Sequence, residues 1–326
     1  MIVLMHVSDL HVGGKMLWVG SMADRWAGRR PAKRPHFHGH DEKVADDLSN
    51  ECGYLCGLYP DLRALVTGDL TRLGKGAEFG LAHRFIHATW RLGPFDPLSP
   101  GLRMGGDRAL TIPGNHDFWA GVVCSPALNR GVLEPHFWPL PWLHVLEDRR
   151  ERLEVHLVGL DSCSGLWHLS PGQAAARGAI DHDQLTEAGK LLALELARAK
   201  LRANKVLRVV LVHHPPHCLA YPARVDFLDW LDRNKVAVIL TGHTHERLVP
   251  QPQQTRPFFE LRCGTTLQAG TYNQLPGLEP NHFFLHAVRG AGPAQAEWRT
   301  VEYWHNGAQW TTSQQPVWGQ TLAALP

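Results

Sequence analysis

Short apolar runs and helical apolar spacings alternate along the chain. Apolar, β-compatible runs bounded by turn residues are typical of buried strands. The helical segments repeat their apolar side chains at a period near 3.6 residues. Strands alternating with helices are the order expected of a parallel α/β sheet. The predicted strands are 2–7, 63–67, 108–112, 153–160, 206–212 and 236–241, and the predicted helices are 41–58, 76–92, 180–204 and 224–234.

Three segments depart from this alternation. Residues 12–40 carry six basic side chains against the single acidic Asp24. We interpret them as a basic insertion, either a solvated loop or a lid that steers an anionic substrate. Residues 119–142 lack a clear period but are rich in aromatic residues, which predicts a packed loop or an aromatic cover for a substrate. Within 257–305, apolar stretches interrupted by Gly and Pro predict antiparallel edge strands.

Length and composition narrow the class of protein. The 326 residues suffice for one large core, and we expect a single domain over 1–309 followed by a tail over 310–326. The net charge of +2 gives no reason to expect a polyanionic partner and argues against a nucleic-acid substrate. No apolar run approaches the roughly 20 residues of a membrane helix. Without a leader pattern or paired zinc spacing among the six Cys, we predict a cytoplasmic protein with reduced thiols.

Metal-competent side chains follow five of the predicted strands. Because ligands at the carboxyl ends of neighbouring strands converge on one crevice of an open α/β sheet, we expect these side chains to meet. Their nitrogen and oxygen donors, without thiolate, favour Mn, Fe or Zn over a pure Mg or Ca oxygen cage. The residues are Asp9, His11, Asp69, Asn115, His116, Asp117, His213, His214, His243 and His245.

The blocks D-x-H, G-D, G-N-H-D, H and G-H-x-H occur in this order over residues 9–245. With these blocks in this order, the chain resembles the calcineurin-like metallophosphoesterase family. The His-His-Pro-Pro turn is similar to that of the bacterial class III cyclic nucleotide phosphodiesterases. The resemblance implies an α/β fold, a four-layer α-β-β-α sandwich of two mixed sheets with a dimetal site at the carboxyl ends of the strands. It also implies a metal-dependent phosphodiesterase, in which a hydroxide bridging two metal ions attacks a phosphate ester.

The resemblance also implies a role for each site residue. Two divalent or trivalent ions would share Asp69 as their bridge. His116 would protonate the leaving oxygen or stabilise charge on the phosphoryl group, with Asp117 holding its tautomer. His213 is preferred as a ligand and His214 is the alternative. The remaining ligands would be Asp9, His11 and His245 for the first ion, and Asn115, His213 and His243 for the second.

The sequence leaves the natural substrate and the oligomeric state open. A cyclic nucleotide, a lipid-linked pyrophosphate and a phosphomonoester are the alternatives. The basic, amphipathic character of 12–40 also suits peripheral contact with a membrane surface. A hypothesis of another class is a non-catalytic scaffold of the same fold, although such scaffolds usually lose ligands and none is lost here. The candidate substrate-binding residues are Arg29, Arg30, Phe137 and Trp138.

Overall fold

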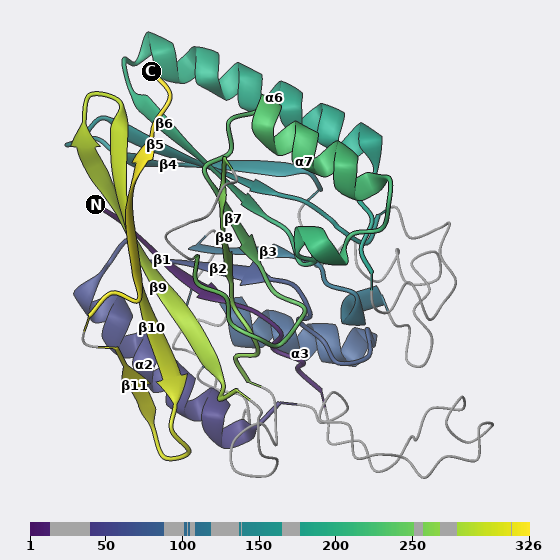
Figure 1. Cartoon of the computed structure of the whole chain (residues 1–326). Helices are drawn as coiled ribbons and strands as arrows, with labels where there is room; N and C mark the ends of the chain where they lie inside the picture. Colours follow the sequence, from purple (N-terminus) through teal and green to yellow (C-terminus); the bar gives the residue numbers. More distant parts are fainter. Residues whose placement is uncertain are drawn as a thin grey trace.

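The chain builds two β-sheets that pack face to face, with helices on the outer side of each sheet (Figure 1). Helices α2 (Glu42–Leu58) and α3 (Gly76–His87) cover the first sheet. Helices α6 (His182–Leu201) and α7 (Ala223–Arg233) cover the second. This arrangement confirms the predicted four-layer sandwich of two mixed sheets. The computed structural model describes residues 1–13, 40–87, 101–102, 104, 108–118, 137, 139–164, 177–250, 257–267, 279–313 and 315–326.

The first sheet combines three parallel strands with four antiparallel ones. Strands β1, β2 and β3 are parallel neighbours, while β9 runs antiparallel to β1 on its other side. The order is β11 (Trp310–Thr312), β10 (Gln295–His305), β9 (His282–Gly292), β1 (Ile2–Val7), β2 (Arg63–Thr67) and β3 (Ala109–Ile112), and β12 (Trp318–Ala323) also pairs with β10.

The second sheet is parallel except at one edge. Strands β5 to β8 run parallel, and β4 is antiparallel to β5. The order is β4 (Trp142–Asp148), β5 (Leu153–Gly159), β6 (Lys205–Leu211), β7 (Val238–Thr241) and β8 (Phe259–Arg262). The carboxyl ends of β1, β2 and β3 in one sheet, and of β6 and β7 in the other, carry the predicted metal ligands.

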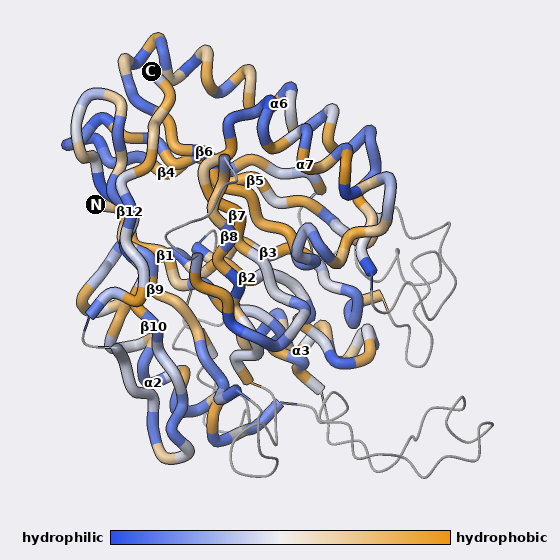
Figure 2. The backbone as a smooth tube through the Cα atoms, in the orientation of Figure 1, coloured by the Kyte–Doolittle hydropathy of each residue, from blue (hydrophilic) through white to orange (hydrophobic). Residues whose placement is uncertain are grey.

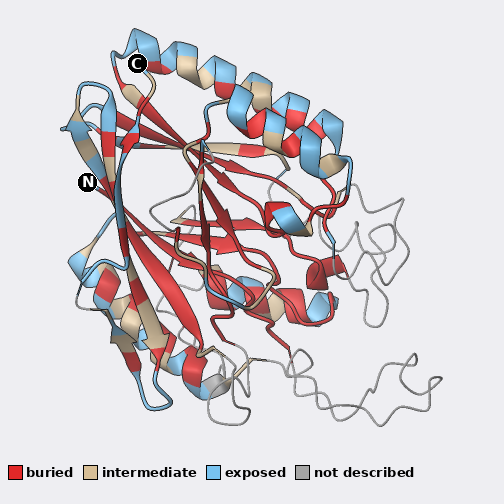
Figure 3. Cartoon of the chain, in the orientation of Figure 1, coloured by how far each residue is buried: buried red, intermediate tan, exposed pale blue. Residues whose placement is uncertain are grey.

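Burial on both faces explains why the strands read as continuous apolar runs. All six residues of β1 are buried. Val3, Met5 and Val7 pack under the helices, whereas Ile2 and Leu4 pack between the sheets. Figure 2 shows the strands of the second sheet as mostly hydrophobic, and Figure 3 shows the strands buried while the helices expose their outer sides. The sandwich therefore holds three cores, one between the sheets and one under each helical layer.

Side-chain capping is found at the start of α2 but not at the start of α6. Asp41 precedes α2 with extended backbone, and its side chain accepts a hydrogen bond from Val44 N at 3.1 Å. Asp181 occupies the position before α6 but makes no side-chain capping bond. Among the described residues no helix is long and apolar enough to cross a membrane.

The C-terminal segment departs from the prediction. Residues 310–326 were expected to be a tail, but they include β11 and β12, both paired with β10. Trp318 and Leu322 are buried against the core between the sheets. Strand β11 has only three residues and β12 is exposed at most positions, so a local apolar period does not reveal either strand. The predicted edge position also fails for β9, which lies between β1 and β10.

Two predicted loops lie mostly outside the described residues. Of the insertion 12–40, the structure describes Val12, Gly13 and His40, where His40 Nδ1 lies 3.2 Å from Gly13 N. Of the aromatic loop 119–142, it describes residue 137 and residues 139–142. The last of these opens β4, a strand that the sequence reasoning missed.

Candidate metal centre

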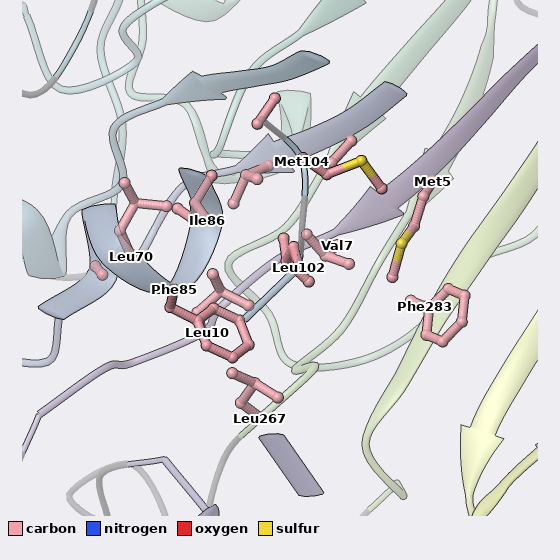
Figure 4. Close-up of a cluster of buried hydrophobic side chains, with 14 of the residues drawn as sticks. Met5, Val7, Leu10, Leu70, Phe85, Ile86, Leu102, Met104, Leu267 and Phe283 are labelled. Atoms are coloured by element: carbon pink, nitrogen blue, oxygen red, sulfur yellow. The ribbon is translucent and has the colours of Figure 1, made fainter. Parts of the chain in front are cut away.

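The loops after β1 and β2 run side by side beyond the ends of their strands. Asp9 N donates to Gly68 O at 3.1 Å, and His11 N donates to Asp69 O at 2.9 Å. Leu10 and Leu70 alternate with these polar residues and point into the core under α3, as Figure 4 shows. The alternation lets one short segment bury an apolar side chain in the core while it presents polar ones to the site.

Left-handed backbone is concentrated at the predicted ligands. Among the described non-glycine residues, eight have positive φ, and five of these are predicted ligands. Asp and His are among the few non-glycine types enriched in this conformation, which otherwise costs about 1–2 kcal/mol per residue. Such strain persists only where the surroundings impose it, and it is common at functional sites. The five are Asp9 (φ 52°), His11 (48°), Asp69 (51°), His243 (73°) and His245 (57°).

Two glycines allow the strand ends to approach one another. Gly68 has φ +92°, and a Cβ added there would lie 2.5 Å from His213 Nδ1. A Cβ added at Gly114 would lie 2.2 Å from Asp69 Oδ1. Both positions therefore require glycine so that a strand end from one sheet can contact the ligands of its neighbours.

One cluster of donors forms around Asp9. His245 Nε2 lies 3.3 Å from Asp9 Oδ1 and 3.2 Å from His11 Nε2. Asp9 Oδ1 is buried and has no hydrogen-bond partner among the described residues. Asp69 completes the group, whose ligand atoms all lie within 4.8 Å of one another. Four nitrogen or oxygen donor atoms gathered at one buried position fit a bound cation.

A second cluster forms around Asn115. Its Oδ1 lies 3.1 Å from His213 Nε2 and 3.0 Å from His243 Nδ1. His214 also approaches this group. The Nδ1 of His214 faces Ser162 Oγ at 2.8 Å. The Nε2 of His213 instead faces Asn115 Oδ1 and, at 3.4 Å, Asp69 Oδ2. His213 Nε2 therefore contacts donors of both clusters, whereas His214 Nε2 is buried without a hydrogen-bond partner among the described residues.

Asp69 lies between the two clusters. Its Oδ2 faces His213 of the second cluster, and its Oδ1 accepts a hydrogen bond from His116 N at 2.8 Å. Burial alone would raise the pKa of Asp69. The neighbouring His213 and His116 outweigh burial and hold that pKa well below its ordinary value. The carboxylate is therefore ionised at neutral pH, as a bridge between two cations requires.

The imidazoles divide by protonation state. Burial, followed by the nearby His116, holds the pKa of His11 well below its ordinary value. Burial and the charge of His213 lower the pKa of His243 to about 3. Both rings are neutral at pH 7, the form that binds metal. At His213, burial would lower the pKa, but Asp69 raises it to about 9, so a cation bound there would displace a proton.

The partners of His116 differ from the prediction. Asp117 was expected to hold the tautomer of His116. Instead, His116 Nδ1 lies 2.9 Å from the Arg72 carbonyl oxygen, which can only accept, so Nδ1 carries the proton. The Asp117 carboxylate accepts from Thr71 N at 2.8 Å and from Gly114 N at 2.9 Å. Asp117 therefore ties the turn after β3 to the loop after β2. Because every residue has a backbone carbonyl, the sequence could not show that Arg72 supplies the partner of His116.

Of the four predicted substrate-binding residues, the structure describes only Phe137. Phe137 is buried in the core under α3, where its ring meets Phe79 edge to face at 6.2 Å. That packing contradicts a substrate-binding role for Phe137. Trp138, Arg29 and Arg30 lie outside the described residues.

Several hydroxyl groups near the ligands were missed by sequence reasoning. Ser8 Oγ donates to Asp9 Oδ2 at 2.6 Å, and Thr265 Oγ1 donates to the Asp9 carbonyl at 3.1 Å. Ser8 is adjacent to Asp9 in sequence, but a single Ser carries no motif. Thr265 lies more than 250 residues away, so only the fold brings it to Asp9.

A four-layer α-β-β-α sandwich with adjoining His and Asp clusters at its strand ends defines a metallophosphoesterase fold. Residues 2–247 match the family described as calcineurin-like phosphoesterase, and the chain belongs to that family. The comparison with curated proteins found no match.

The chain is similar to solved structures at low sequence identity. A Plasmodium protein, GAP50, described as the anchor in the inner membrane complex, has a TM-score of 0.53 and 8% identity, and the match covers 100% of this chain and 89% of that one. The calcineurin-like phosphoesterase YfkN from Bacillus subtilis has a TM-score of 0.45 and 10% identity, over 99% of this chain and 90% of that one.

Proposed function

We propose that the chain is a dinuclear metal-dependent phosphoric ester hydrolase, and more narrowly a phosphodiesterase acting on a small-molecule substrate. The observation that carries the proposal is the pair of adjoining donor clusters on either side of the buried Asp69. The unsatisfied Asp9 Oδ1 and the all-nitrogen-and-oxygen donor set fit a pair of cations. Which of Mn, Fe and Zn is native stays open.

The residues of the two clusters would hold one cation each. Asp9, His11 and His245 would bind the first, and Asn115, His213 and His243 the second, with Asp69 shared. When bound, a pair of cations neutralises phosphoryl charge and acidifies the attacking water. The chain's own contribution is to fix these donors, through buried strand ends and strained loops, before the cations arrive.

His116 would act on the leaving group. Its ring lies 4.6 Å from that of His11, centroid to centroid, which places it beside the first cluster. Because Nδ1–H is committed to the Arg72 carbonyl, Nε2 is the atom that would hold a proton for the departing oxygen or donate a hydrogen bond to the phosphoryl group. His116 N also donates to Asp69, so one residue links the bridge to proton transfer.

We propose a small phosphate ester as the substrate. A cyclic nucleotide is the substrate suggested by the His-His-Pro-Pro turn, and a lipid-linked pyrophosphate or a phosphomonoester is the alternative. The basic insertion, including Arg29 and Arg30, would attract any of these anions or a membrane surface. A cytoplasmic location is part of the same proposal.

The competing function is a non-catalytic scaffold. GAP50 is described as an anchor, and it shares the fold. Retention of every predicted ligand at the site, with their donor atoms in contact, favours the enzyme. A scaffold would take up no stoichiometric transition metal and would leave bis(p-nitrophenyl) phosphate intact.

The test combines metal analysis with hydrolysis. Asp69→Asn should lose both metal ions on dialysis and should lose hydrolysis of bis(p-nitrophenyl) phosphate, because a neutral amide is a poor bridge. The matched control is Asp148→Asn, the same change at a buried residue at the end of β4, where the carboxylate pairs with the amino group of Met1 and not with any candidate ligand. Two metals per chain with normal turnover in Asp69→Asn would remove Asp69 as the bridge. A wild-type chain without metal or hydrolysis would establish the scaffold.

A further inference from the structure

Hydroxyl groups from two distant parts of the chain surround Asp9. Ser8 precedes it at the end of β1, and Thr265 and Thr266 follow β8 in the other sheet. All three are buried, with exposures of 0%, 1% and 0%. The two threonines lie beyond residue 247, where the match to the family ends. Only Ser8 of the three lies within the matched range, so the two threonine contacts are not part of the five sequence blocks.

The side-chain contacts of Asp9 give its two oxygens different roles. Oδ2 accepts two hydrogen bonds, from Ser8 Oγ at 2.6 Å and from His243 N at 3.1 Å. Oδ1 faces His245 Nε2 at 3.3 Å. With Oδ2 committed to two donors, the carboxylate cannot rotate without breaking them. Oδ1 would thereby be the oxygen of Asp9 left to bind a cation at the first position.

The backbone contacts hold Asp9 in its left-handed conformation. Thr265 Oγ1 donates to the Asp9 carbonyl at 3.1 Å. Thr266 makes two hydrogen bonds with the backbone of Ser8, the residue before Asp9. Thr266 Oγ1 accepts from Ser8 N at 3.1 Å, and Thr266 N donates to Ser8 O at 3.1 Å. Thr266 Oγ1 in turn donates to the His282 carbonyl at 3.0 Å, which fixes the direction of its lone pairs.

We propose that Ser8, Thr265 and Thr266 are positioning residues that hold Asp9 with Oδ1 directed at the first metal position. The inference rests on the proposed function, because it assumes that Asp9 binds a cation. Partners that orient a ligand typically change metal affinity by about 10- to 100-fold when they are removed. The loss should fall on the first half-site and spare the second, whose ligands these hydroxyls do not contact.

Titration of single half-sites would test the assignment. A His213→Ala background weakens the second half-site, so Mn²⁺ titration of the metal-free protein by calorimetry reports on the first. Adding Ser8→Ala there should weaken Mn²⁺ binding about 10- to 100-fold. A His11→Ala background reports on the second half-site, where Ser8→Ala should leave the Kd unchanged.

Matched variants separate positioning from general loss of stability. Ser49→Ala removes another buried serine hydroxyl, one that donates to Ala45 O at 2.9 Å inside α2. Thr300→Val removes a buried hydroxyl that accepts from Trp298 Nε1 at 3.1 Å in β10. Neither should alter Mn²⁺ affinity. Thr265→Val should weaken the first half-site, and Thr265→Ser, which keeps the hydroxyl, should restore it.

The outcomes distinguish the inference from the proposed function. Weakened first-site binding in Ser8→Ala, with restoration by Thr265→Ser, supports the inference. Wild-type Mn²⁺ affinity in both Ser8→Ala and Thr265→Val would overturn it while leaving the proposed function standing. Equal weakening at both half-sites would also overturn it, since that result indicates a general structural role. A wild-type chain that binds no Mn²⁺, Zn²⁺ or Fe²⁺ would overturn the proposed function itself.

Discussion

Gly242→Ala tests how closely the two sheets must approach at the site. Gly242 follows β7 and donates its N–H to the His213 carbonyl at 3.0 Å. A Cβ added at this position would lie 1.9 Å from Ser8 Oγ and 2.7 Å from Asp9 Oδ2. Non-bonded heavy atoms are comfortable at about 3.5–4.0 Å. The methyl group would therefore occupy the space of the Ser8 hydroxyl.

The size of the effect follows from what must move. If Ser8 turns away, Asp9 loses a hydrogen bond to a charged group, worth about 1.5–3 kcal/mol. If Ser8 stays, the strand ends must separate, and overpacking of this kind costs about 1–3 kcal/mol. Either response predicts about 1–3 kcal/mol of lost stability, together with weaker metal binding at the proposed first half-site. The backbone of Gly242 is not left-handed, so lack of space alone carries the effect.

The measurement is urea unfolding of the metal-free protein, together with Mn²⁺ titration. Gly80→Ala is the matched control, because Gly80 lies inside α3 and a Cβ there meets nothing within 4 Å. That variant should gain about 0.5–1 kcal/mol from helix propensity, with unchanged metal binding. A Gly242→Ala protein as stable as wild type and equal to it in Mn²⁺ affinity would refute the close packing described for this site.

Two further predictions concern proton transfer and acid stability. His116→Ala should retain both metals, lose about 10²- to 10⁴-fold in turnover on an alkyl or ribose ester and lose much less on a p-nitrophenyl ester; equal losses on the two esters would exclude proton donation. For Glu154, burial would raise the pKa, but bonds from Arg202, His156 and Asn204 lower it from 4.5 to about 2. The stability carried by its ionised form should be complete above about pH 4.5 and lost as the pH falls toward about 2. Arg202 is 44% exposed, so solvent screens part of its interaction with Glu154. We therefore expect Glu154→Gln to reduce the pH dependence of the unfolding free energy by about 2 kcal/mol, which is less than the whole pKa shift would give. Urea unfolding at a series of pH values measures this, and an unchanged loss of stability between about pH 4.5 and pH 2 would contradict the assignment.

The apolar pattern of the sequence predicted those strands and helices whose own residues carry a clear signal of burial or capping. Strand β1 matches its predicted span because both of its faces are covered and its run is continuously apolar. Helix α2 matches because Asp41 caps it. Strands β4 and β12 escaped prediction because their burial depends on pairing with β5 and β10 rather than on a clean alternation of their own. Their burial patterns are mixed, so neither reads as a buried strand.

The convergence of the candidate ligands was predictable for a different reason. Side chains at the carboxyl ends of neighbouring strands must converge, so order along the chain translates directly into position. The residues alone left the choice between His213 and His214 open, and only the family resemblance preferred His213, because adjacent residues at a strand end differ only in the direction they face. Thr67 O and Ser162 Oγ settle that direction by fixing one ring each, at 2.7 and 2.8 Å. Neither contact is encoded in local sequence.

If the candidate ligands bind metal as proposed, the strain of their backbone sets stability against metal binding at this site. Each left-handed residue costs about 1–2 kcal/mol that glycine would relieve, yet glycine offers no ligand. The fold offsets that cost with contacts from outside the motifs, such as the Thr265 bond to the Asp9 carbonyl. Asp and His, the types that metal binding requires, are also among those that tolerate the conformation best. The same backbone turn that strains Asp69 directs its carboxylate between the two clusters, so relaxing the loop would move the bridge away from the cations it is proposed to share.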